Sequence, residues 1–182
     1  MDLGLPNLLA PARVHEATGN GRHVFACGVA VAIRGAVLWV QDTKQGDMLY
    51  PPGATRFFDP ARLVMVRPTG RLPVLQVMEE ALRSGAAPLV VGELDQAPDL
   101  TASRRLQLAA GTGGGRGLCL VPEGRLCSNA AETRWRCAPM PGGGVARQHW
   151  EIVKNKKGRL GQWDVCWDGT RFGAAVREVE MA

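Results

Sequence analysis

Residues 88–110 read PLVVGELDQAPDLTASRRLQLAA, a short apolar run followed by a polar loop and an amphipathic segment. The apolar run at 89–91 has the length of a buried strand in a parallel sheet, and Glu93 closes it. In nucleotide-binding α/β domains, a carboxylate at the end of such a strand lies near the bound metal. Many strand and helix units, however, carry no chemistry of their own. The stretch therefore predicts an α/β crossover unit whose one candidate functional residue is Glu93.

The rest of the first two thirds of the chain alternates between strand and helix patterns. The helix within 88–110 is expected to begin at a Thr101 or Ser103 cap, with Leu106 and Leu108 buried. The glycine-rich residues that follow are expected to form a flexible connector at 111–115. Other strands are expected at 36–40, 63–66 and 117–121, and a covering helix at 74–82. This alternation predicts an α/β fold with a mostly parallel sheet in a three-layer core.

Composition and charge limit the class of protein. A chain of 182 residues suffices for one main core and a smaller appendage. The net charge is +5, and eighteen of the 22 basic residues are arginines, which suit phosphates or carboxylates. Such a charge fits a nucleic acid or an acidic protein partner, or solubility alone. Five cysteines without a C-x-x-C pair indicate reduced structural thiols. The longest apolar run, at 24–33, is too short to cross a bilayer, so we expect a cytoplasmic protein without membrane contact.

Residues 14–33 read VHEATGNGRHVFACGVAVAI, a polar loop with glycines followed by a helix of small apolar residues. A working phosphate loop has the pattern G-x-x-x-x-G-K-[ST], because the lysine reaches the outer phosphates and the hydroxyl holds magnesium. Gly19 and Gly21 can supply the turn, but Arg22 and His23 stand where the lysine and the hydroxyl residue should follow. We interpret this stretch as a degenerate phosphate loop without ATP hydrolysis, and we expect no cofactor, no metal and no catalytic residue. Arg22 still allows an anion to bind at the helix N-terminus.

The pattern changes at residue 125 to aromatic and basic strands, so we divide the chain into an α/β core, 1–124, and a C-terminal antiparallel β region, 125–182. The core is expected to close without that region. Three segments, 133–137, 149–154 and 162–167, alternate as half-buried strands do. The second and third are expected to form a hairpin with a basic tip. Four of the five tryptophans lie here, and they either stack on bases or fill the core of a small sheet. The candidate contacts to a partner or to nucleic acid are Arg134, Trp135, Arg136, Lys154, Lys156, Lys157, Arg159 and Trp163.

Taken in order, a series of blocks resembles the ImuA family, the RecA-like component of a bacterial damage-induced mutagenesis cassette. RecA itself is similar in layout, but this chain departs from its ATPase pattern at Arg22-His23 and at Gly92-Glu93. The resemblance implies a RecA-like three-layer core without hydrolysis, followed by a small antiparallel β extension. The resembling blocks span nearly the whole chain and are HEATGNG at 15–21, VLWVQD at 37–42, YPPG at 50–53, DPARLVMVR at 59–67, MEEALRSGA at 78–86, VVGEL at 90–94, DLTASRRLQLAA at 99–110, TRWRC at 133–137 and WEIVKNKKGRLGQWDVCW at 150–167.

What the resemblance implies is a non-catalytic adaptor in SOS-induced translesion synthesis. Its expected partners are an ImuB-like relative of Y-family polymerases and an error-prone DnaE-type polymerase, with RecA as a further candidate. Non-specific DNA contact through the basic hairpin tip is a second possibility that the residues leave open. The alternative is a SulA-like inhibitor of cell division that binds FtsZ, because that family shares the RecA-like core. An adjacent gene for a Y-family-like protein would favour the adaptor.

Overall fold

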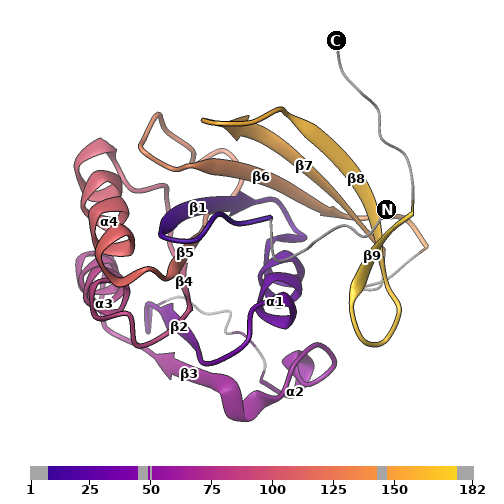
Figure 1. Cartoon of the computed structure of the whole chain (residues 1–182), viewed down its shortest axis with the longest axis horizontal. Helices are drawn as coiled ribbons and strands as arrows, with labels where there is room; N and C mark the ends of the chain where they lie inside the picture. Colours follow the sequence, from indigo (N-terminus) through magenta and orange to yellow (C-terminus); the bar gives the residue numbers. More distant parts are fainter. Residues whose placement is uncertain (1–7, 45–48, 50, 143–146, 176–182) are drawn as a thin grey trace.

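One nine-stranded β-sheet runs through the molecule, with helices against both faces (Figure 1). The structure is a computed structural model that describes residues 8–44, 49, 51–142 and 147–175. The strands are β1 (Arg13–Thr18), β2 (Val37–Gln41), β3 (Leu63–Val66), β4 (Leu89–Glu93), β5 (Arg116–Leu120), β6 (Thr133–Pro139), β7 (Arg147–Asn155), β8 (Gly161–Trp167) and β9 (Phe172–Ala175). The helices are α1 (Arg22–Ala32), α2 (Pro51–Ala54), the short 3-10 turn η2 (Pro60–Arg62), α3 (Arg71–Ser84) and α4 (Leu100–Gly113).

The sheet has a parallel part and an antiparallel part, which meet at β6. Its strand order is β3-β2-β4-β5-β1-β6-β7-β8-β9. The strands from β3 to β6 in that order are parallel neighbours, whereas β6 to β9 pair antiparallel. One face of the parallel part packs against α1, and the other packs against α3 and α4. The predicted fold class is confirmed: a three-layer α/β core with a mostly parallel sheet and an antiparallel extension.

The central strand β1 is the most important element that the sequence prediction missed, besides the short α2 and β9. The residues that the sequence analysis assigns to a polar loop form a strand between β5 and β6, in which His15, Glu16 and Thr18 are all buried. The His15 ring contacts the Thr133 hydroxyl at 2.7 Å and the Ala10 carbonyl at 3.1 Å. Burial lowers the pKa of His15 to about 4, so the ring is neutral at physiological pH. A polar strand therefore occupies the middle of the sheet because the side chains of His15 and Glu16 have partners inside the protein.

Helix α4 begins earlier and ends later than predicted. Its N-cap is Asp99, whose carboxylate accepts from the backbone N–H of Ala102 at 2.8 Å, so neither Thr101 nor Ser103 is the cap. The expected connector at 111–115 is instead largely the last turn of the helix, which ends at Gly114 in the left-handed conformation. Leu106 is buried as predicted, but Leu108 is 74% exposed. A large apolar side chain therefore projects into solvent from the middle of α4.

The antiparallel extension curves over α1 and encloses an aromatic cluster (Figure 1). Phe25 of α1 lies 5.0 Å from the ring centres of both Trp135 and Trp150. Phe172 of β9 lies 5.0 Å from Trp150. Trp135 and Trp150 are each 1% exposed, and Trp163 packs against Trp135 at 5.7 Å. These tryptophans are core residues, as one of the two sequence-based interpretations predicts, and do not offer faces for stacking on bases. Their core is continuous with the one that α1 covers on the parallel strands.

No helix in the described part of the chain combines the length and the apolarity needed to cross a membrane. The division at residue 124 into two folding units stays a prediction, and two features of the structure speak against it. β6 pairs directly with β1, and side chains from both sides of the division share one buried cluster.

We expect a chain truncated after residue 124 to be insoluble or to lack cooperative unfolding. Truncation removes Trp135, Trp150 and Phe172 from the cluster around Phe25. Loss of one large buried aromatic side chain costs about 3–5 kcal/mol, and the whole stability of a domain is about 5–15 kcal/mol. The measurement is the soluble yield and the urea unfolding curve, with the full chain expressed in parallel as the control. A soluble fragment with a single sharp transition would instead establish 1–124 as an independent unit.

Candidate functional site

The loop between β1 and α1 is short and packs directly against β6. It spans residues 19–21, and the N–H of Gly21 donates to the carbonyl of Cys137 at 2.9 Å. Gly19 has a φ of +86°, and a Cβ placed there would lie 2.3 Å from the same carbonyl oxygen. A Cβ on Gly21 would lie 2.9 Å from the backbone nitrogen of Ala138. The glycines therefore serve a close approach of two backbones.

The side chains beside this loop are occupied by other protein groups. Arg22 turns back and donates from Nη1 to the carbonyl of Gly19 at 3.0 Å. Glu93, at the end of β4, accepts from Trp39 Nε1 at 2.7 Å and lies 3.1 Å from His23 Nε2. The strand-end glutamate thus binds neighbouring side chains, and no group of three or more potential metal ligands gathers anywhere in the described residues.

Asp42 follows the end of β2 and serves as a loop cap. Its carboxylate accepts from the backbone N–H groups of Lys44 and Gly70, each at 2.9 Å. These hydrogen bonds lower the pKa of the Asp42 carboxyl. At the edge of the sheet that carries the carboxyl ends of the parallel strands, where ligands usually bind in open α/β sheets, the carboxylates of Asp42 and Glu93 are therefore held by protein groups.

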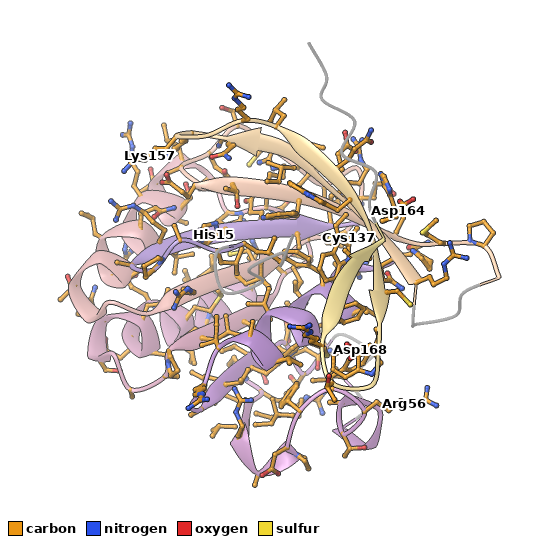
Figure 2. All side chains as sticks on the ribbon, turned by 45° about the vertical axis from the view of Figure 1, so that its right-hand side comes forward. His15, Arg56, Cys137, Lys157, Asp164 and Asp168 are labelled. Atoms are coloured by element: carbon orange, nitrogen blue, oxygen red, sulfur yellow. The ribbon has the colours of Figure 1, made fainter. Side chains whose placement is uncertain are left out.

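The basic hairpin tip lies at the opposite end of the sheet. β7 runs antiparallel to β6, so the turn after Asn155 lies beside the start of β6, while Cys137 lies toward the other end (Figure 2). Lys154 Nζ donates to the carbonyl of Asn129 at 2.8 Å, and Lys156 Nζ donates to that of Ala130 at 2.7 Å. Burial, with nearby Arg134 as the next cause, lowers the pKa of Lys154. The two lysines hold the segment that leads into β6, whereas Lys157 is exposed.

The remaining predicted contacts divide between the interior and the surface. Arg134 Nε donates to Glu16 Oε2 at 2.7 Å, and their side chains are only 14% and 1% exposed. Asn129 Nδ2 donates to the other oxygen of the same carboxylate. Arg136, by contrast, is 53% exposed and lies 3.1 Å from Glu151.

The remaining predicted contact residues are two tryptophans and one arginine. Trp135 is enclosed in the core and presents no surface to a partner, and Trp163 is partly buried against it. Arg159 is exposed at the hairpin tip. The structure therefore brings Arg134, Lys154 and Lys156 together around residues 127–132, and separates them from Arg136.

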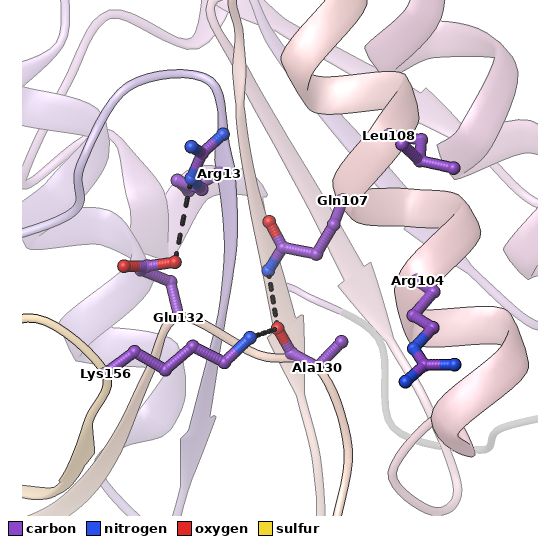
Figure 3. A pocket seen from close by; sticks show the side chains of 7 residues that line it. All are labelled: Arg13, Arg104, Gln107, Leu108, Ala130, Glu132 and Lys156. Carbon is purple, nitrogen blue, oxygen red and sulfur yellow. Dashed lines mark hydrogen bonds and ion pairs between the residues drawn. The ribbon is translucent and has the colours of Figure 1, made fainter.

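Sequence reasoning missed a surface hollow of about 420 Å³ between α4 and the hairpin tip (Figure 3). Four separate segments build it, so no spacing pattern in the sequence could reveal it. Two signals were nevertheless present, namely the exposed Arg104 and the basic tip. The hollow is lined by Arg13, Arg104, Gln107, Leu108, Ala130, Glu132 and Lys156.

The sheet order, the helices on both faces and the antiparallel extension define a three-layer α/β protein with a mostly parallel sheet, in which the loop after β1 packs against β6. No protein-family model matches the chain. It is 37% identical over 179 aligned residues to Protein ImuA of Caulobacter vibrioides strain NA1000 / CB15N, and equally to Protein ImuA of strain ATCC 19089 / CIP 103742 / CB 15. Each comparison covers 82% of this chain and 72% of the relative. The chain belongs to the ImuA family.

We predict that Arg134→Met lowers the free energy of unfolding by about 3–5 kcal/mol, because it leaves the buried Glu16 carboxylate without its cation. Arg136→Met is the matched control, since it makes the same change two residues along β6 at an exposed ion pair. Its expected cost is below about 1 kcal/mol. Urea unfolding of both variants measures the difference. Similar small losses in the two variants would show that Glu16 does not depend on Arg134.

Proposed function

We propose that this protein is a non-catalytic RecA-like adaptor in SOS-induced translesion synthesis and mutagenesis. Membership of the ImuA family is the observation that carries this proposal. The adaptor works in the cytoplasm with an ImuB-like relative of Y-family polymerases and an error-prone DnaE-type polymerase. RecA is a further candidate partner. The geometry of the loop after β1 supports the non-catalytic part of the proposal.

Phosphoryl transfer depends on positioning and on charges around the transferred group. A working phosphate loop offers several free backbone N–H groups, a lysine and a hydroxyl. Here the loop has three residues, and the N–H of Gly21 is used by Cys137. The Arg22 guanidinium contacts the loop's own carbonyl at Gly19. A nucleotide would have to displace these contacts in order to bind in the loop. We therefore propose that the fold acts as a scaffold.

The first test is steady-state phosphate release from ATP with magnesium. We expect phosphate release from the purified protein to equal the buffer background. The loop has neither a phosphate cradle nor a hydroxyl side chain that could hold magnesium. Arg22→Ala is the control for a contaminating ATPase, since it removes the cation nearest the loop while leaving the fold intact. Release above background that Arg22→Ala abolishes would contradict the non-catalytic assignment.

The second test is genetic. Deletion of the gene should reduce damage-induced mutation to the spontaneous frequency, and a plasmid copy should restore it. Overproduction should leave cell length unchanged. Filamentous cells on overproduction, together with binding of the purified protein to FtsZ and normal damage-induced mutation in the deletion strain, would favour the SulA-like alternative.

A further inference from the structure

We propose that the hollow between α4 and the hairpin tip binds an acidic, amphipathic segment of a partner protein. The proposal rests on the adaptor function and names the surface that such an adaptor would use. The hollow lies at the end of the sheet opposite the closed loop after β1, on the side where helix α4 covers the sheet (Figure 3).

Helix α4 presents an exposed apolar and basic stripe, of which Arg104 and Leu108 line this hollow and Leu100 lies one turn before Arg104, outside the lining. Leu100, Arg104 and Leu108 are spaced four residues apart, so they lie on successive turns of one helix face. Leu100 is 45% exposed and Leu108 is 74% exposed, and both are among the few large apolar side chains that the described part of the protein exposes. An arginine between two exposed leucines matches a carboxylate between two apolar side chains on a partner segment.

The charge of the hollow favours an anionic group. Arg13, Arg104 and Lys156 line it, and among the described residues the one lining carboxylate is that of Glu132, which is 7% exposed and 3.6 Å from Arg13. Arg104 is exposed and has no ion pair within the described residues. A carboxylate on the partner would complete the pairing of Arg104, and such complementary charges speed association and select partners.

The floor of the hollow is fixed before any partner binds. Gln107 Nε2 donates to the carbonyls of Val14 at 2.8 Å and Ala130 at 2.9 Å. Lys156 Nζ donates to the same Ala130 carbonyl, so helix, loop and hairpin meet at one atom (Figure 3). A preformed site loses little conformational entropy on binding.

A protein segment fits this surface better than nucleic acid does. Non-specific binding of single strands needs aromatic side chains on which bases can stack. Trp135 and Trp150 are enclosed in the core, and no aromatic side chain lines the hollow. The exposed leucines instead supply apolar contact area.

The test measures binding of the full chain to the purified ImuB-like protein and to the DnaE-type polymerase over a salt series. Leu108→Glu should weaken binding to one of them at least tenfold, mainly through faster dissociation. Arg104→Glu should slow association, most strongly at low salt. The matched controls are Leu72→Glu, a leucine on α3 that is 64% exposed, and Arg34→Glu, an exposed arginine with no ion pair among the residues that the structure describes. Both controls should stay within twofold of wild type, and all four variants should unfold at the wild-type urea concentration.

A photo-crosslinker at position 108, with position 72 as the control, identifies what lies in the hollow. The expected product joins position 108 to a partner segment with acidic residues within one turn of apolar ones. A product with a dT oligonucleotide, with a second copy of the chain, or with a basic or uncharged segment would overturn the proposal. Wild-type binding by both Leu108→Glu and Arg104→Glu would also overturn the proposal, and in that case the adaptor function would stand. A deletion strain with normal damage-induced mutation would reject the function itself.

Discussion

The buried ion pair between Glu16 and Arg134 is the interaction on which the rest of the structure depends. It joins β1, the middle strand of the nine-stranded sheet, to β6, where the antiparallel extension begins. A buried carboxylate is costly unless cations and hydrogen-bond donors surround it. Arg134 and Asn129 supply these groups to the two oxygens of Glu16. This pairing lets a polar strand occupy the centre of a nine-stranded sheet.

The closed loop after β1 follows from the same junction. Once β6 is held beside β1, Cys137 is carried to the point where β1 ends, and its carbonyl accepts from Gly21. The chain must turn there within three residues to start α1, and only glycine leaves room for the backbone of β6 at Gly19 and Gly21. The feature that resembles a phosphate loop in the sequence is thus part of the packing between the core and its extension.

The sequence predicts elements whose stabilising contacts are local and misses those whose partners are distant. β2, β4 and β5 are apolar runs, and their burial follows from composition alone. β1 reads as a loop because His15 and Glu16 find their partners in residues more than 110 positions away, such as Thr133 and Arg134.

The hairpin tip shows the same limit for the candidate site. Its lysines read as a solvated charge cluster, yet Lys154 and Lys156 donate to carbonyls of a loop about 25 residues earlier. Alternation in β6 locates a half-buried strand but cannot tell which face α1 covers. Trp135 was therefore a candidate contact from sequence and is a core residue in the structure.

These contacts place the two ends of the sheet in different roles. Open α/β sheets usually bind ligands where the parallel strands end, because helix N-termini and loops converge there. In this protein Glu93, Arg22 and Gly21 all have partners within the chain at that end. At the other end, Arg104 and Leu108 project from α4 beside a hollow whose floor is already fixed. A core whose loop after β1 is held by its own contacts thus still presents a rigid, charged surface at its other end, which suits the adaptor function that we propose.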